Sequence, residues 1–236
     1  MKGIKKAIEE FTQSLPQSTV EKCPYLPGKA WITRLFITYH IDPAVYENLL
    51  AYGYRRSGYI IYKNQCPGCT ACTPIRTDTE NFTPTKSQKR TIKKNNDIKI
   101  IISDLNFDEQ IFKLYKKYIA DKHNNHKTNT QEFISFLCES PLETKIMRYY
   151  LGKKLIGAGF IDILPDGISS VYFAYDPAEK KRSLGTYSMI KEIEYSRHLG
   201  KKWLYSGFYI AETSKMSYKA RFTPAQIAKD GIWKNK

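Results

Sequence analysis

The sequence lacks several features that would point to common classes of protein. No apolar run approaches the roughly 18 residues that a membrane-spanning helix needs. The first residues, MKGIKKAIEEFTQSL, lack the continuous apolar core of a signal peptide, because Glu9 and Glu10 interrupt it. We therefore expect a cytoplasmic protein with no membrane partner. The P-loop, G-x-S-x-G and H-E-x-x-H motifs are also absent, so a Ser or Cys nucleophile has no support.

Acidic residues are scarce relative to basic ones. The chain has 23 Asp and Glu against 38 Lys and Arg among its 236 residues, which gives a formal net charge of +15. A surplus of this size favours a polyanionic partner, most often a nucleic acid. Hydrophobic residues make up 42% and aromatic residues 14%, so the chain can still bury a core and is not a disordered polycation.

The apolar patterns predict an α+β protein built from two similar units, 1–104 and 105–236. In the first unit, WITRLFITYHI and YRRSGYIIYK are expected strands around a helix that Asp42 caps and Gly53 ends. In the second, TKIMRYYLG, LIGAGFIDIL and SSVYFAYD form an antiparallel meander, and a helix ending at Gly200 follows. We expect mixed, mainly antiparallel sheets flanked by helices.

The segment KSQKRTIKKNN predicts a strongly basic helix. Like charges three and four residues apart repel by ~0.2–0.5 kcal/mol per pair, and a phosphate backbone would offset that repulsion. The alternative is a solvated basic face, but Asp97 is the one acid nearby, so we favour phosphate contact. The cations concerned are Lys86, Lys89, Arg90, Lys93 and Lys94.

Two further basic segments flank expected helix starts. In DPAEKKRSLGTYS, basic residues precede a helix N-terminus, where exposed N–H groups and the helix dipole attract anions; ordinary capping by Ser183 explains the same residues. In ETSKMSYKARFTP, one helical turn would gather Lys215, Tyr218 and Lys219, or these would form a solvated basic surface. The first segment contributes Lys180, Lys181, Arg182, Ser183, Gly185 and Thr186.

Adjacent arginines stand in the expected strand GYRRSGYIIY. Neighbours in a strand point to opposite faces, so one of Arg55 and Arg56 could enter a pocket, with Arg76 close by. Two guanidinium groups that converge on a pocket would bind a carboxylate bidentately. A surface ion pair is an equally good explanation.

Three cysteines crowd into CPGCTAC. Cys66, Cys69 and Cys72 could join Cys23 in a zinc or iron–sulfur site, which usually takes four ligands. The alternatives are a loop whose thiols pack together, or thiol redox control. The HNNH segment at 123–126 could hold a metal, although a polar loop after a helix is the commoner meaning.

These pieces, in this order, resemble the arginyl-tRNA–protein transferase family, and within it the bacterial branch of aspartate/glutamate leucyltransferases. The resemblance covers nearly the whole chain, with the first 20 residues and 104–145 weakly constrained. It rests on CPYLPG (23–28), YENLLAYGYRRSGYIIY (46–62), CPGCTACTPIR (66–76), FTPTKSQKRTIKKN (82–95), VYFAYDP (171–177), SLGTY (183–187) and KMSYKARFTP (215–224).

The resemblance implies two acetyltransferase-like (GNAT-like) units. It implies transfer of leucine from leucyl-tRNA to proteins or peptides that begin with Asp or Glu, and entry of the product into the N-degron (N-end rule) route of degradation. No cofactor would be required, because the aminoacyl ester is already activated. Eukaryotic relatives carry two local cysteine pairs associated with metal binding, but Leu26 and Thr70 stand where the second cysteine of each pair would be.

The resemblance also suggests a division of labour. Arg55, Arg56, Arg76 and Lys219 would bind the acceptor carboxylate. Asp176 would guide the amine proton, and Tyr187 and Tyr218 would donate hydrogen bonds. The basic helix, the 180–182 cluster, the SLGTY helix start and Lys215 would hold the tRNA. The rival functions are transfer of arginine instead of leucine, a coenzyme A-dependent N-acyltransferase, and a non-enzymatic RNA-binding protein.

Overall fold

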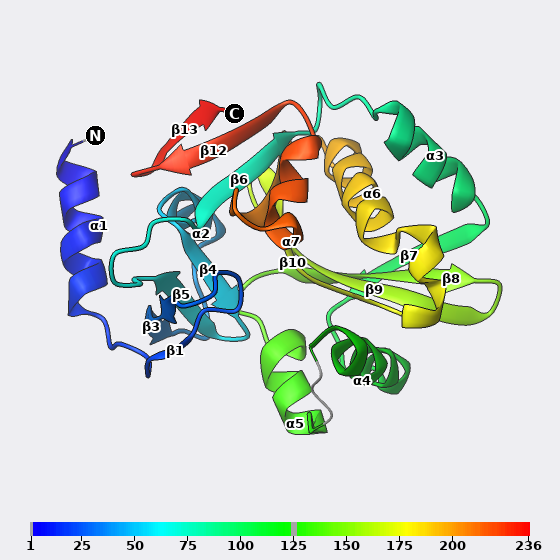
Figure 1. Cartoon of the computed structure of the whole chain (residues 1–236), viewed down its shortest axis with the longest axis horizontal. Helices are drawn as coiled ribbons and strands as arrows, with labels where there is room; N and C mark the ends of the chain where they lie inside the picture. The colour runs from blue at the N-terminus through cyan, green and yellow to red at the C-terminus, as the bar shows by residue number, and fades with distance from the viewer. Residues whose placement is uncertain (1, 124–126) are drawn as a thin grey trace.

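The computed structural model describes residues 2–123 and 127–236, and within them the chain forms three β-sheets (Figure 1). The side chains of His123 and His126, in the segment considered for a metal, lie outside the described part. Both termini lie on the same side of the molecule, where Lys5 pairs with Asp230 at 3.1 Å (Figure 1). No helix in the described ranges is both long and apolar enough to cross a membrane.

The N-terminal part carries a three-stranded sheet in the order β3-β5-β4. Asp42 Oδ1 accepts bonds from the backbone N–H of Ala44 and Val45 at 2.8 and 3.1 Å, and Pro43 begins the helix, so the predicted cap is confirmed. The elements are α1 (Lys2–Ser14), β1 (Glu21–Lys22), β2 (Ala30–Trp31), β3 (Thr33–Ile37), α2 (Pro43–Ala51), β4 (Tyr54–Ser57) and β5 (Ile60–Asn64).

The remaining strands form an eight-stranded sheet in the order β13-β12-β6-β11-β10-β9-β8-β7. β10 and β11 are parallel, and the other neighbours are antiparallel. The predicted α+β class with mainly antiparallel sheets is therefore confirmed. The strands are β6 (Thr73–Asp78), β7 (Ile98–Asp104), β8 (Thr144–Leu151), β9 (Lys154–Ile163), β10 (Gly167–Tyr175), β11 (Trp203–Tyr209), β12 (Ala225–Lys229) and β13 (Ile232–Asn235).

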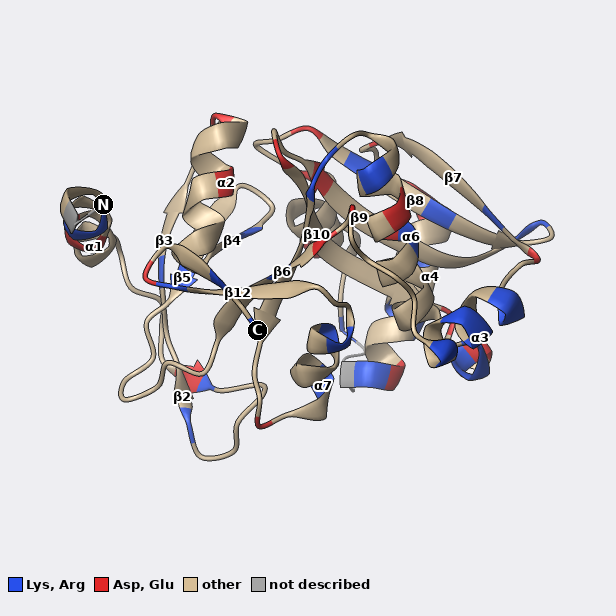
Figure 2. Cartoon of the chain, turned by 90° about the horizontal axis from the view of Figure 1, so that it is seen from above, with Lys and Arg blue, Asp and Glu red and all other residues tan. Residues whose placement is uncertain are grey.

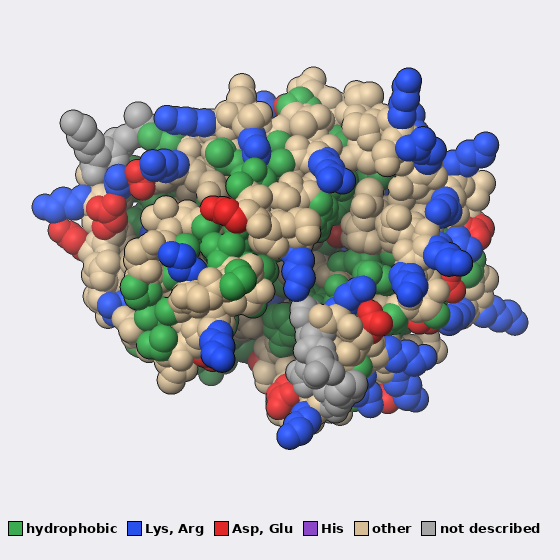
Figure 3. Space-filling model, viewed as in Figure 1, with side chains coloured by type: hydrophobic (Ala, Val, Ile, Leu, Met, Phe, Trp, Pro, Cys, Tyr) green, Lys and Arg blue, Asp and Glu red, His purple; other side chains and the backbone are tan. Residues whose placement is uncertain are grey.

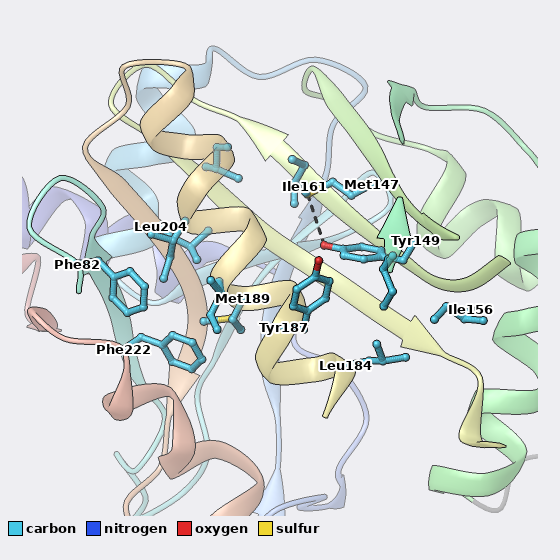
Figure 4. Close-up of a cluster of buried hydrophobic side chains, with 14 residues drawn as sticks. Phe82, Met147, Tyr149, Ile156, Ile161, Leu184, Tyr187, Met189, Leu204 and Phe222 are labelled. Atoms are coloured by element: carbon cyan, nitrogen blue, oxygen red, sulfur yellow. Dashed lines mark hydrogen bonds between the residues drawn. The ribbon is translucent and has the colours of Figure 1, made fainter. Parts of the chain in front are cut away.

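Helices cover both faces of the large sheet (Figure 1). On one face, α3 (Lys86–Lys94) and α6 (Leu184–His198) lie over a core in which Tyr149 and Tyr187 pack with ring centroids 6.1 Å apart (Figure 4). On the other, α4 and α5 cover an aromatic-rich core. The remaining elements are α4 (Glu109–His123), α5 (Thr130–Phe133), the π-helix η1 (Ile134–Cys138), the 3-10 helices η2 (Pro177–Arg182) and η3 (Tyr218–Arg221), and α7 (Ser214–Ser217).

The sheet order bears on the predicted division into 1–104 and 105–236. Strands β6 and β7 precede residue 104, yet they join the same sheet as β8 to β13. β6 lies between β11 and β12, which come from the C-terminal third of the chain. The division into two units stays a prediction, but the two sheets themselves do not separate at residue 104.

Candidate active site

A cavity of about 360 Å³ opens where β10 and β11 stop pairing. The parallel pairing joins Gly167 to Trp203 and ends at Ser169 and Tyr205. Beyond these residues both strands carry register shifts, and the segments Ser169–Phe173 and Ser206–Phe208 line the cavity. Residues of the three-stranded sheet and of α2, α4, α6, α7 and η3, with Tyr25 between β1 and β2, complete the lining.

Two glycines make this geometry possible. A Cβ on Gly167 would lie 2.6 Å from the backbone oxygen of Trp203, so only glycine lets the two strands begin their parallel pairing this closely. Gly207 has a φ of +87°, a conformation that favours glycine, and it lies within the irregular part of β11. Its carbonyl turns to a side chain and accepts a bond from Arg55 Nη2 at 2.6 Å.

Arg55 is a buried cation that has no acidic partner among the residues that the structure describes. Its side chain lies over the ring of Phe208, with the guanidinium carbon 5.4 Å from the ring centroid. Nε and Nη1 are buried and have no hydrogen-bond partner among the described residues. Burial lowers the pKa of Arg55. The structure therefore holds a positive charge at the cavity with two unused donors, an arrangement that a bound carboxylate would complete.

Arg56 is committed to the protein interior, although it also borders the cavity. Its Nη2 lies 2.6 Å from Asp162 Oδ1, its Nε donates to Asp162 Oδ2 at 2.8 Å, and Thr144 Oγ1 accepts a third bond at 3.1 Å. Burial opposes the charge, but the Asp162 carboxylate raises the pKa of Arg56 overall. The two neighbouring arginines thus have different partners. Arg55 bonds to a backbone carbonyl, and Arg56 is already paired with the carboxylate of Asp162.

Arg76 does not reach the cavity lining. Its guanidinium lies between two indoles, 3.6 Å from the ring centroid of Trp203 and 4.4 Å from that of Trp233. Gln226 Oε1 accepts bonds from its Nε and Nη2 at 3.0 and 2.7 Å. These contacts join β6 to β11, β12 and β13, so Arg76 stabilises the end of the large sheet.

Lys219 and Lys215 bring two more cations to the cavity. Lys219 Nζ donates to the carbonyl of Phe208 at 2.9 Å, beside Arg55. Burial, reinforced by the charge of Arg55, lowers the pKa of Lys219 to about 7. Tyr218 also lines the cavity, and burial raises its pKa to about 12, so its hydroxyl stays a hydrogen-bond donor at neutral pH. No Asp or Glu belongs to the lining in the described ranges.

The helix start predicted at SLGTY lies partly at the cavity. Gly185 belongs to the lining, and Thr186 follows it in the first turn of α6. Ser183 adopts a left-handed conformation with a φ of 56° and its side chain makes no capping bond, so capping by its hydroxyl does not explain its presence. Asp176 caps η2 through the N–H of Ala178 and pairs with Lys154 at 2.7 Å.

Asp176 and Tyr187 have no place in the cavity lining. The contacts of Asp176 hold η2 against β9. Burial by itself would raise the pKa of Asp176, but hydrogen bonds from Lys154 and from the N–H of Ala178 outweigh burial, so the pKa is lowered. Tyr187 is buried in the core beneath α6 (Figure 4). The amine-proton role of Asp176 and the donor role of Tyr187 therefore stay predictions that this geometry does not favour.

The basic helix forms as predicted and carries an exposed cationic surface (Figures 2 and 3). Thr85 and Gln88 close a capping box at its start. Its five cations are exposed, and none makes an ion pair within the described ranges. Lys94 Nζ donates to the carbonyl of Lys181 at 2.9 Å, which brings the end of α3 against η2. We call α3 and η2 together the basic surface.

Within the basic surface, the cations of η2 differ in whether an acidic side chain already pairs with them. Lys180 and Lys181 are exposed. Arg182 forms a bidentate pair with Asp97, with both N–O distances 3.0 Å, and a further contact with Glu179. Arg182 thus fixes η2 to the end of α3, and the side chains of Lys180 and Lys181 carry the available charge.

Two family models match this chain. The model for the N terminus of arginine-tRNA-protein transferase covers residues 21–90, and the model for its C terminus covers residues 110–229. The chain belongs to the arginine-tRNA-protein transferase family. The resemblance drawn from the sequence is therefore confirmed, and the cavity and the basic surface are features of a member of this family.

Curated relatives match over almost their whole length. The chain is 35% identical over 217 residues to an aspartate/glutamate leucyltransferase of Marinobacter nauticus, covering 90% of this chain and 91% of that protein. It is 37% identical over 223 residues to one of Saccharophagus degradans, covering 92% and 94%. A crystal structure of the C-terminal domain of a putative lysylphosphatidylglycerol synthetase of Agrobacterium fabrum matches with a TM-score of 0.48 at 8% identity, over 75% of this chain and 55% of that one.

In this family member the cysteine loop packs behind residues that line the cavity, among them Phe208 and Met216. Cys72 packs with Tyr25 and Leu26 against Phe208 and Met216. Burial, with the nearby thiols of Cys66, Cys23 and Cys69 adding to it, raises the pKa of Cys72 to about 11, so this thiol is protonated at neutral pH. The predicted proximity of the thiols is thus borne out for Cys72 and its three neighbours.

The cysteines do not present a ligand set for a metal. No group of three or more His, Cys, Asp and Glu side chains in the described ranges is placed to hold a metal ion. Cys23 Sγ accepts a bond from the N–H of Leu26 at 3.4 Å, and Cys66 Sγ donates to the carbonyl of Ile32 at 3.7 Å. The zinc or iron–sulfur site considered from the sequence therefore finds no matching geometry here.

Sequence reasoning missed part of the site. Tyrosines from the three-stranded sheet and its helix, Tyr46 and Tyr62, line the cavity beside Arg55, and burial raises the pKa of both. Ser170, Ser188 and the buried Glu192 behind them were also missed. A signal existed for the last pair: Ser188 and Glu192 lie four residues apart on a helix, and each directly precedes an apolar residue, Met189 and Ile193.

Proposed function

We propose that the protein transfers leucine from leucyl-tRNA to the α-amine of proteins and peptides that begin with Asp or Glu. The observation that carries this proposal is the cavity charge: Arg55 and Lys219 lie together, no described Asp or Glu lines the cavity, and the chain is of this transferase family. An acidic acceptor residue would supply the missing negative charge. If the donor carried arginine in place of leucine, its guanidinium would enter a cavity lined by arginine and lysine, with no carboxylate among the described lining residues.

Acceptor binding follows from the two cations. The acceptor carboxylate would receive bonds from Arg55 Nε and Nη1, the buried donors that lack partners. Lys219, whose pKa of about 7 leaves it close to half charged at neutral pH, would gain a proton as the carboxylate approaches. Held in this way, the acceptor would project its α-amine along the cavity towards β10 and the start of α6.

Donor binding would use the basic surface. The exposed cations of α3, with Lys180 and Lys181, would contact tRNA phosphates, and Lys215 and Gly185 lie where the cavity meets the start of α6. The aminoacyl ester would then enter the cavity, where holding both substrates in place can supply up to roughly 7–11 kcal/mol. Tyr218 is available there as a hydrogen-bond donor to the developing oxyanion.

In the cell, the product would be recognised by its new N-terminal leucine and enter the N-degron route of degradation. A cytoplasmic location stays a prediction and agrees with this role. The transfer needs no cofactor in this proposal, since the ester bond of leucyl-tRNA supplies the driving force.

The function is tested with a panel of acceptors. Peptides that begin with Asp, Glu, Asn or Lys are incubated with labelled leucyl-tRNA or arginyl-tRNA, and the labelled product is quantified. We expect leucine on the Asp and Glu peptides alone, because only these carry the carboxylate. Equal labelling of all four peptides would contradict the proposal, and so would acyl transfer from acetyl-CoA in place of the tRNA ester.

The basic surface is tested with a variant in which four cations of α3 are replaced by alanine: Lys86, Arg90, Lys93 and Lys94. The logarithm of the tRNA binding constant falls as the logarithm of the salt concentration rises. Each lost phosphate contact should make this slope less steep by ~0.7–0.9, so the loss of four contacts should make it less steep by about 3. Leucyl-tRNA affinity should fall, while kcat at saturating tRNA should change little. Affinity and slope are measured by fluorescence anisotropy.

A matched control removes four exposed lysines outside the basic surface, Lys6, Lys29, Lys113 and Lys234. It lowers the net charge by the same amount. If the control weakens tRNA binding as much as the α3 variant does, the effect is one of total charge and the assignment of α3 is wrong.

A further inference from the structure

Glu192 is a buried carboxyl group immediately behind the cavity lining. Its side chain is 1% exposed, and it forms no ion pair with a described Lys, Arg or His. Oε1 accepts a bond from Ser188 Oγ at 2.9 Å, and Oε2 is buried without a partner. Ser188 itself lines the cavity, as does Ser170, which lies close to the Glu192 carboxyl.

Within the described part of the chain, no positively charged side chain pairs with Glu192. Tyr149 of β8 and Tyr218 of η3 are titratable groups close to it, and Ser170 of β10 and the backbone of Gly159 in β9 also lie nearby. Burial raises the pKa of Glu192 to about 7. A buried carboxyl with an unused oxygen is costly, and the cost is greatest in its charged form. Its position next to the cavity points to a role in proton transfer.

We propose that Glu192 is a positioning residue that draws the proton of the acceptor amine through Ser188. The inference rests on the proposed function. Ser188 Oγ, which touches the cavity, would accept the proton of the amine and pass its own proton to Glu192 Oε1. Glu192 therefore acts through Ser188 and does not itself contact the substrate.

The proton and bond changes balance within the known substrates. The amine nitrogen bonds to the ester carbonyl carbon, and its surplus proton moves through Ser188 to the Glu192 carboxylate. The bond from the carbonyl carbon to the ribose oxygen then breaks, and that oxygen takes the proton back from Glu192 by the same path. The products are the leucyl amide and the free ribose hydroxyl, and Glu192 returns to its carboxylate form.

The pH dependence has a definite sign. The proposed role needs the carboxylate, which dominates above the pKa of about 7. The rate at saturating substrates should therefore rise with pH through 7. A normal α-amine also loses its proton near pH ~7.7–8.0 and would mask this rise. An acceptor with an N-terminal α-hydrazino acid, whose terminal nitrogen is much less basic, isolates the contribution of Glu192.

The test compares Glu192→Gln, Ser188→Ala and the control Glu194→Gln, an exposed residue on the same helix. We expect the first two variants to lose at least ~100-fold in kcat, with KM for leucyl-tRNA and peptide changed by less than about threefold. With the hydrazino acceptor, the rise through pH 7 should disappear in Glu192→Gln and persist in Glu194→Gln.

Several results would overturn the proposal. Full activity in Ser188→Ala would remove the path, and an unchanged pH profile in Glu192→Gln would show that another group takes the proton. A rise in KM for leucyl-tRNA with kcat preserved would place Glu192 on the donor's α-ammonium instead. If Glu192→Gln does not fold, Ser188→Ala decides alone. The proposed function fails separately, if the wild-type protein transfers no leucine to any acidic peptide.

Discussion

Replacing Arg55 by methionine is expected to lower kcat/KM for acceptors that begin with Asp or Glu by at least ~30-fold. Truncating one partner of a buried, hydrogen-bonded charge pair costs about 2–5 kcal/mol, and Arg55 is a buried guanidinium with two unused donors at the cavity. The tRNA affinity should stay unchanged, because the basic surface is untouched. Steady-state kinetics with acidic peptides and tRNA binding by anisotropy measure the two effects.

The same substitution should leave stability unchanged or higher. Arg55 is 7% exposed and has no acidic partner in the described ranges, so methionine removes a buried, uncompensated charge. This combination of lost activity and preserved stability is the signature of a residue kept for its ligand. Arg55→Met with normal kcat/KM for acidic peptides, or with weakened tRNA binding alone, would show that the acceptor carboxylate binds elsewhere.

Unlike Arg55→Met, the replacement of Arg56 by methionine should destabilise the protein and lower the free energy of unfolding by about 3–5 kcal/mol. The substitution strands the Asp162 carboxylate, which is 0% exposed and whose remaining side-chain partner is Thr144 at 2.7 Å. Chemical denaturation of the wild type and the variant gives the difference directly.

The double variant Arg56→Met, Asp162→Leu is the matched control. It removes both charges and fills the space with apolar side chains, so it should recover most of the lost stability. If Arg56→Met is as stable as the wild type and loses only its use of acidic acceptors, then Arg56 belongs to the acceptor site, as the sequence had suggested, and not to the interior.

The two arginines show where sequence reasoning succeeds and where it stops. The sequence predicted an arginine pair on a strand beside a pocket, and alternation along the strand predicted that their side chains diverge. The structure shows that both are buried: Arg55 reaches Gly207 of β11, and Arg56 reaches Asp162 of β9. Asp162 is 106 residues away from Arg56 in the chain. No local pattern indicates which of two neighbouring cations will meet a distant carboxylate.

Arg76 and Glu192 also show the limits of local sequence patterns. Arg76 was predicted at the site and lies outside it, and Glu192 was not predicted and lies next to it. Arg76 follows the cysteine loop and was expected in the pocket, but its guanidinium lies between Trp203 and Trp233 and does not line the cavity. Glu192 looked like an ordinary helix position, yet it lies behind the cavity because α6 crosses β10 there. Both outcomes depend on the order of strands in the sheet.

By itself, the sequence determined the α+β class, the capped helices, the basic helix of α3 and the family, because these depend on local propensity, charge spacing and ordered motifs. The tertiary structure alone decided the cavity and its charges. Parallel pairing that ends after Ser169 and Tyr205 opens the space, and contacts between residues up to 152 positions apart choose which cation stays unpaired. Local residue patterns do not encode such contacts, since they arise only when distant strands meet and exclude water.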